Sequence, residues 1–127
     1  MATFTPLSSG FSIRQSGCEM VDLAWSDNHL EAVFKTDADA FVCVTFEQLV
    51  TARIVDEFIF SVDEAKTGIS AEGFAYTVAD GAMLANLPEA VTRTYKNLRQ
   101  YAFITLGSCL EVLSTEPPSF ELLEPQG

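Results

Sequence analysis

The sequence predicts a mainly β fold, at the margin of the α+β class: an antiparallel β-sandwich or partly open barrel with one or two short helices. Two observations support this prediction. Several short stretches alternate apolar and polar residues, and Gly, Pro, Asp or Asn separate most of them. Helical spacing of apolar residues occurs only after residue 80. The 127 residues, 48% of them hydrophobic, suit a single domain spanning 1–127 with one core.

The strongest β pattern lies between residues 98 and 114. Tyr101 and Phe103 alternate with apolar residues of the other face, so both faces are apolar and the strand is expected to be central. A turn at Gly107-Ser108 leads into a second strand, where Glu111 is a carboxylate among apolar neighbours. We expect Glu111 to face solvent, because a buried carboxylate needs a cation or several hydrogen-bond donors.

The other expected strands follow the same reasoning. They lie at residues 10–14, 21–26, 29–36, 41–46, 49–55, 73–78 and 120–123. The second and third form a hairpin about Asp27-Asn28, with one face buried and one solvated. The polar pair Glu47-Gln48 interrupts a long β-rich run and predicts either a bulge or a corner between two sheets. The first 17 residues otherwise read as a loosely ordered lead-in, and residues 58–61 receive no assignment.

The helical region begins near Asp80, whose side chain is expected to cap the first turn. Apolar residues follow at helical spacing. Pro88 either interrupts this segment or opens a second helix at its first position. In that second helix Glu89 and Arg93 would form an i,i+4 pair.

Composition limits the partners. The chain has 7 Lys and Arg against 18 Asp and Glu, a net charge of −11. Such a surface repels nucleic acids and anionic membranes and suits a basic protein partner or simple solubility. No apolar run is long enough for a membrane span, and no secretory signal is evident. The three cysteines, an odd count without paired spacing, predict a reducing, cytoplasmic location and no disulfide framework.

The sequence contains no recognisable catalytic set. His29 is the only histidine and adjoins a hairpin turn, which excludes the usual zinc spacing and leaves a Ser-His-Asp triad without supporting motifs. The glycines are scattered, so no phosphate-binding loop is present. We therefore expect no catalytic residue, no metal site and no cofactor, and favour a non-enzymatic role while leaving weak enzymatic activity open.

Two polar groups are candidates for binding. The first combines Arg53, Asp56, Glu57, Tyr101 and Glu111, which either line a polar pocket inside the β scaffold or form a salt bridge that joins a strand to its neighbour. The second is a basic and aromatic cluster near residues 93–101, which either receives an acidic ligand or partner or is the charged outer face of a helix end. Its members are Arg93, Tyr95, Lys96, Arg99 and Tyr101.

The segments 52–57 and 98–118 resemble a family of small uncharacterised bacterial proteins. The shared pattern is Arg-Val-x-Asp-Glu, then a tyrosine-containing strand, then Glu-Val-Leu-Ser and Glu-Pro. The pattern covers about a third of the chain. This chain departs from it at one position, since it has Arg99-Gln100-Tyr101 where the pattern has Arg-His-Tyr. The resemblance implies a bacterial cytosolic protein without an assigned activity, and the missing histidine argues against histidine-dependent chemistry at that position.

Three functions follow from these features. We favour a protein-interaction module, and by analogy with other small acidic proteins an immunity-type inhibitor that neutralises a toxin. The second is a small-molecule binding protein or weak enzyme with a pocket around Arg53, Glu57, Tyr101 and Glu111. The third is an oligomeric structural subunit such as a homodimer, since small sandwiches often pair their edge strands.

Overall fold

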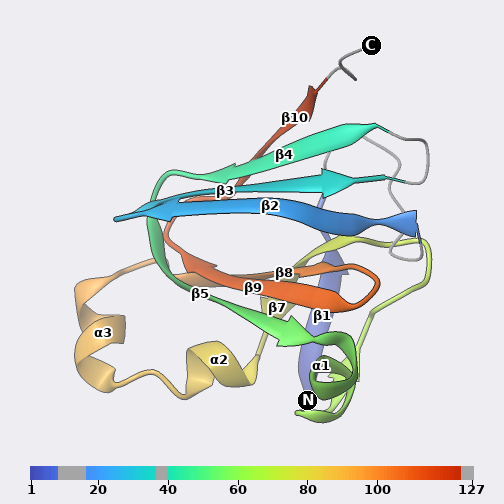
Figure 1. Cartoon of the computed structure of the whole chain (residues 1–127). Helices are drawn as coiled ribbons and strands as arrows, with labels where there is room; N and C mark the ends of the chain where they lie inside the picture. Colours follow the sequence, from blue (N-terminus) through green and yellow to red (C-terminus); the bar gives the residue numbers. More distant parts are fainter. Residues whose placement is uncertain (9–16, 37–39, 124–127) are drawn as a thin grey trace.

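Two β-sheets pack face to face in the computed structural model, which describes residues 1–8, 17–36 and 40–123 (Figure 1). The fold is mainly β and mostly antiparallel, with short helices at one end of the sandwich, as the sequence predicts. The predicted strand at residues 10–14 lies outside the described residues.

The larger sheet has six strands in the order β5-β9-β8-β7-β1-β6. Their bounds are β1 Ala2–Pro6, β5 Leu49–Asp56, β6 Lys66–Thr67, β7 Ala75–Ala79, β8 Arg99–Ile104 and β9 Ser108–Ser114. The short β6 runs parallel to β1, and all other pairs are antiparallel. The hairpin of β8 and β9 is central, which confirms the prediction made from its two apolar faces.

The smaller sheet has four strands in the order β10-β4-β3-β2. Their bounds are β2 Glu19–Ser26, β3 His29–Lys35, β4 Phe41–Phe46 and β10 Ser119–Leu123. The chain leaves this sheet at Glu47-Gln48 and enters the larger one at Leu49, so the polar break is the corner between two sheets. A bulge follows between Leu49 and Thr51 in β5.

The main core lies between the two sheets. Leu30, Ala32 and Phe34 alternate along β3 with exposed or half-buried residues, which is the pattern of a strand with one solvated face. Phe103 of β8 contacts Phe34, Phe46, Phe74 and Phe120 with ring centroids 5.6 to 6.4 Å apart. Aromatic rings thus join the two sheets across the centre of the sandwich.

A second, smaller core covers the outer face of the six-stranded sheet. Phe4 makes edge-on contacts with Phe60 and Tyr76, each at 5.8 Å between centroids. Phe60 belongs to helix α1, Glu57–Val62, which lies at the end of β5. Because α1 and the segment after it cover this face, the central strands are apolar on both sides.

The structure corrects several sequence expectations. Residues 58–61 form most of α1, and residues 2–6 form β1 rather than a loose lead-in. The helical region divides into α2 Ala82–Ala85 and α3 Glu89–Thr94, so the described residues contain three short helices rather than one or two. Gly81, not Asp80, precedes α2, because Asp80 adopts a left-handed φ of 58° and cannot occupy the capping position.

Pro88 precedes α3 at the N-cap, one position before the first helical residue where it was expected, and Arg93 pairs with Glu89 at 2.7 Å as expected. Among the described residues, no helix combines the length and apolar character needed to cross a membrane.

Candidate functional site

An ion pair between Arg53 and Glu111 lies on the outer face of the six-stranded sheet. The two residues are direct partners in the register of β5 and β9, and Arg53 Nε donates to Glu111 Oε2. The Glu111 side chain has no exposed surface, whereas that of Arg53 is 41% exposed. The expectation that Glu111 faces solvent is therefore wrong: its face is covered by the second core, and Arg53 supplies the cation that burial requires.

The ion pair continues into a chain of alternating charges. Arg53 Nη2 contacts Asp63 Oδ2 at 3.0 Å, and Lys66 Nζ contacts Asp63 Oδ1 at 2.5 Å. The Lys66 ammonium also lies 4.6 Å from the centroid of the Phe60 ring. The pKa of Arg53 is raised above its ordinary value, chiefly by the hydrogen bond to Glu111 and further by the charges of Glu111 and Asp63. Burial acts in the opposite direction. The network ties β5 and β9 to the turn after α1.

Two further polar side chains, the half-buried Glu64 and the buried Gln100, support helix α2. Glu64 Oε2 accepts from the backbone N–H of Ala82 at 2.9 Å, and Gln100 Oε1 accepts from that of Leu84 at 3.2 Å. These bonds satisfy donors of the first helical turn that have no partner within the helix. The second polar atom of each side chain, and Glu111 Oε1, are buried without a protein partner among the described residues. Polar atoms in that position commonly hold ordered water.

The other predicted site residues lie apart from this network. Asp56 Oδ1 accepts from Phe58 N at 2.9 Å and caps α1, and Glu57 Oε2 accepts from Gly107 N at 3.2 Å. Tyr101 belongs to the main core on the opposite face of the sheet. The structure thus brings Arg53 and Glu111 together and separates Asp56, Glu57 and Tyr101 from them, so these five residues do not line one shared pocket.

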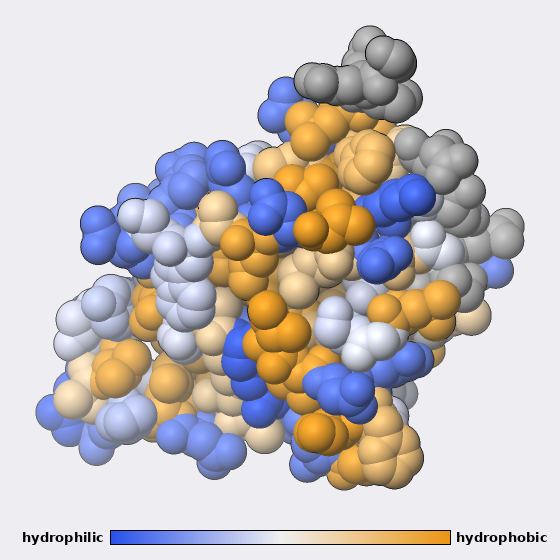
Figure 2. All heavy atoms as spheres, in the orientation of Figure 1, coloured by the Kyte–Doolittle hydropathy of each residue, from blue (hydrophilic) through white to orange (hydrophobic). Residues whose placement is uncertain are grey.

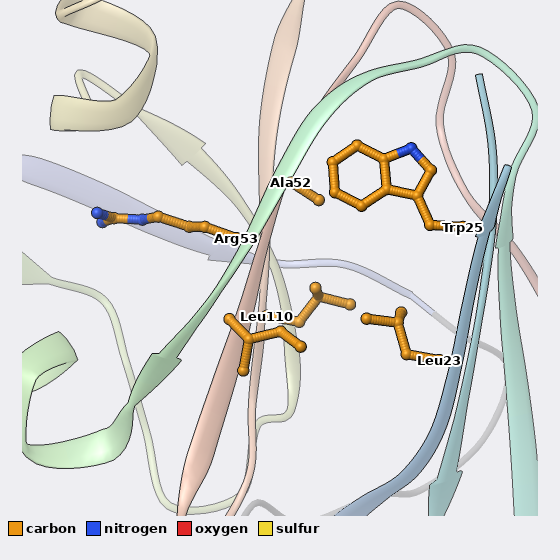
Figure 3. A pocket seen from close by; sticks show the side chains of 6 residues that line it. Leu23, Trp25, Ala52, Arg53 and Leu110 are labelled. Carbon is orange, nitrogen blue, oxygen red and sulfur yellow. The ribbon is translucent and has the colours of Figure 1, made fainter. Parts of the chain in front are cut away.

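A separate apolar groove opens between the edge strands β2 and β5. Leu23 and Trp25 project from β2 toward Ala52 of β5 and Leu110 of β9, while the Arg53 guanidinium points away (Figure 3). The groove has a volume of about 170 Å³. The indole N–H of Trp25 donates to the carbonyl of Asp27 at 3.0 Å, which fixes the orientation of the ring.

Core-facing residues remain exposed along this groove. Trp25 and Ile54 stand opposite buried core partners in their sheets, yet they are 48% and 52% exposed. Phe58, Ile59 and Val62 of α1 are also more than half exposed. Figure 2 shows hydrophobic side chains gathered in the middle of this face, with hydrophilic groups on either side. We call the groove together with these α1 residues the open side of the sandwich.

Sequence reasoning did not find the open side, because strand order decides which core-facing residues lie at a sheet edge. Leu23 and Trp25 alternate along β2 and share one face, and Leu23 packs against the main core. Nothing in the sequence indicated that β2 and β5 would be the outermost strands of their sheets at this side. The only signal was the large apolar Trp25 beside a turn.

The described residues show no arrangement typical of a reactive centre. No group of three or more His, Cys, Asp or Glu side chains among them could hold a metal ion. Burial raises the pKa of the Cys109 thiol to about 11, so it stays protonated at neutral pH, and burial also raises the pKa of Cys43. The Arg53–Glu111 network has the form of a structural salt bridge.

Comparisons of the chain with protein-family models, with curated proteins and with solved structures found no match.

Proposed function

We propose that this chain is a protein-interaction module that binds a basic protein through the open side of the sandwich. The observation that supports this proposal is the half-exposed pair Trp25 and Ile54, whose side chains face the core but remain uncovered. Exposed apolar groups gathered in one place, with polar groups around them, are typical of interaction sites. Burying one such side chain contributes about 1.5–3 kcal/mol.

The charge around the open side favours a basic partner. Residues 19–35 and 49–65 form β2, β3, β5, α1 and their turns. Their carboxylates are Glu19, Asp22, Asp27, Glu31, Asp56, Glu57, Asp63 and Glu64. These segments contain only two Lys or Arg residues, Lys35 and Arg53, and Glu111 and Asp63 already pair with Arg53. A partner with an apolar side chain flanked by Lys or Arg would fill the groove and complement this rim.

The edge strands suit the same kind of partner. β2 and β5 each end a sheet, so each presents backbone groups along its free side. An extended segment could add to either edge through backbone hydrogen bonds while its side chains enter the groove. An immunity-type inhibitor bound to a basic toxin would belong to this class of interaction. The buried Cys18 and Cys109 thiols are compatible with the reducing cytoplasm that we propose as its location.

Site-specific photo-cross-linking followed by a binding measurement tests the proposal. A photo-reactive residue at position 54 captures the partner in source cells, and the purified partner is then titrated by calorimetry. Ile54→Asp should weaken binding at least tenfold, because it places a charge in the apolar groove and adds to the acidic rim. Leu122→Asp is the matched control, since Leu122 is 49% exposed and lies on the edge strand β10.

The outcomes separate the interaction module from the structural subunit. An acidic partner, or equal loss of affinity in both variants, would refute the proposal. Cross-linking of position 54 only to a second copy of the chain, with a dimer in sedimentation analysis, would favour the structural-subunit alternative instead. Failure to capture any protein at position 54 would also count against an interaction module.

A further inference from the structure

A second cavity, distinct from the open side, lies where β8 meets the segment between β9 and β10. Its volume is about 360 Å³, within the range of small-molecule sites. The residues that line it are Leu7, Thr77, Arg99, Tyr101, Thr115 and Pro117. None of them lines the groove between β2 and β5. Arg99 and Tyr101 alternate along β8 and so project from the same side of the strand.

The Tyr101 side chain is buried, and its hydroxyl has no hydrogen-bond partner among the described residues. Tyr101 is 2% exposed, and its ring packs against Phe46 at 5.4 Å between centroids. Its hydroxyl makes no hydrogen bond with any of the described residues, although the side chain lines the cavity. The other strongly buried tyrosine, Tyr76, instead donates to Ser70 O at 3.1 Å. The Tyr101 hydroxyl is therefore available for a partner that enters the cavity.

Arg99 provides an uncommitted positive charge beside this hydroxyl. Arg53 and Arg93 both form ion pairs, whereas Arg99 forms none with the part of the chain that the structure describes. Arg99 and Tyr101 line the same cavity; burial raises the pKa of Tyr101, and the charge of Arg99 lowers it. The phenol remains protonated at neutral pH and can donate a hydrogen bond to an anion.

The rest of the cavity is suited to a small, partly apolar molecule. Thr77 and Thr115 add hydroxyl groups, whereas Leu7 and Pro117 provide apolar contacts. One arginine balances a single negative charge. A dianion such as a phosphate monoester would need further cations in a chain whose net charge is −11. The chemistry therefore fits a monoanion better than a phosphate.

We propose that this cavity binds a small organic monocarboxylate, with Arg99 and the Tyr101 hydroxyl holding the carboxylate and Leu7 and Pro117 contacting its apolar part. The assignment gives a role to two residues of the basic and aromatic cluster that the sequence analysis singled out. It does not depend on the proposed protein partner, because the two sites share no lining residue.

Titration by NMR tests the proposal. Benzoate, butyrate and pyruvate are added separately to the ¹⁵N-labelled chain, with inorganic phosphate as a comparison anion. At least one carboxylate should shift the amide signals of Thr77, Tyr101 and Thr115 in a saturable manner, and phosphate should shift them less. Arg99→Gln should weaken this binding about tenfold or more, because it removes a charge-assisted hydrogen bond. Arg93→Gln should leave it unchanged.

The hydroxyl has its own test. Tyr101→Phe should weaken carboxylate binding about three- to tenfold while leaving the thermal midpoint unchanged or slightly raised, since it removes a hydroxyl that has no hydrogen-bond partner in the described part of the chain. A structural role for this hydroxyl would instead lower the midpoint. The proposal is overturned if none of the three carboxylates produces saturable shifts, if phosphate binds better than all of them, or if Arg99→Gln binds as the parent does.

Discussion

Glu111 carries a carboxylate with no exposed surface, and Arg53 is the cation that neutralises it. Arg53→Met should lower the free energy of unfolding by about 3 kcal/mol, because it leaves a buried charge without its partner. Urea denaturation at pH 7 measures the change.

The control is the double variant Arg53→Met/Glu111→Leu, which removes both charges and keeps apolar volume. It should recover more than half of the lost free energy, since no unpaired charge remains on the covered face. A loss below about 1 kcal/mol in Arg53→Met would show that water reaches Glu111 and that the pair is not structural.

His29 is held between two carboxylates, with Glu47 Oε2 3.2 Å from Nδ1 and Glu31 Oε1 3.4 Å from Nε2. The hydrogen bond to Glu47, followed by that to Glu31, raises the pKa of His29 above its usual 6.5. A raised pKa contributes stability that is fully present below pH 6.5 and disappears as the pH rises through the pKa of the folded state. Stability from this source therefore decreases between slightly acidic and slightly alkaline pH.

Because His29 is the only histidine, its ring signals can be followed by NMR titration without ambiguity. Glu47→Gln should lower the pKa of His29 toward 6.5, and Glu31→Gln should lower it by less. An unchanged pKa in Glu47→Gln would mean that the side chains do not meet in solution.

At the scale of single residues, the sequence placed Arg53 and Glu111 in one candidate group with Asp56, Glu57 and Tyr101 but could not determine which of them pair or whether they are buried. The two residues are 58 positions apart, and only the pairing register of β5 with β9 brings them together. Whether Glu111 faces solvent depends on what covers the outer face of the sheet. That cover comes from α1 and the segment after it, which no alternation in β9 itself could reveal.

At the scale of elements, the close approach of the turn after β6 to β1 depends on Gly68. Gly68 has a left-handed φ of 95°, and a Cβ there would collide with the backbone carbonyl of Phe4. Gly107 has a similar φ of 90°, but the space around it is open. Both Gly→Ala variants incur backbone strain of roughly 1–2 kcal/mol, and only Gly68→Ala also displaces a strand.

Gly68→Ala should therefore lower the free energy of unfolding by about 1 kcal/mol or more beyond the loss in Gly107→Ala. Urea denaturation of the two variants gives the comparison, with Gly107→Ala as the measure of backbone strain alone. Equal losses would show that β1 moves aside without cost.

Elements with one solvated face were the easiest to predict from the sequence. In the β2–β3 hairpin the turn and β3 lie close to where the pattern places them, whereas β2 begins two residues earlier than predicted and has a bulge between Met20 and Asp22. Helix α1 was missed because Phe58, Ile59 and Phe60 are consecutive apolar residues, which suit a buried strand as well as a helix. In the structure only Phe60 of these three is buried. A run of three apolar residues does not show which of them faces the core, so it gives no helical periodicity.

At the scale of the whole molecule, the sequence predicted the sandwich but not its order of strands. Local alternation determines which residues face inward, whereas the sheet order depends on non-local pairings such as β1 beside β7. That order leaves Trp25 and Ile54 at the two edges of one side and places Arg99 and Tyr101 beside the segment that leads to β10. Both candidate binding sites therefore follow from topology.

The net charge of −11 leads to a prediction for the whole chain. Salt screens the repulsion among carboxylates, which stabilises the folded state, and it also weakens exposed ion pairs, which destabilises it. Exposed pairs such as Glu89–Arg93 contribute about 0–1 kcal/mol each, and the buried side of the Arg53–Glu111 pair is screened less. Repulsion should therefore dominate. Salt should then raise the thermal midpoint by roughly 4 °C for each kcal/mol by which screening stabilises the folded state.

Thermal unfolding followed by circular dichroism in about 10 mM and 150 mM sodium chloride at pH 7 measures this rise, since the Debye length falls from about 30 Å to 8 Å over that range. The same comparison at pH 5 is the control. That pH is closer to the isoelectric point near 4.2, so fewer carboxylates are ionised and the effect of salt should be smaller. A midpoint that falls with salt at pH 7 would show that specific ion pairs, rather than overall repulsion, determine how this acidic sandwich responds to ionic strength.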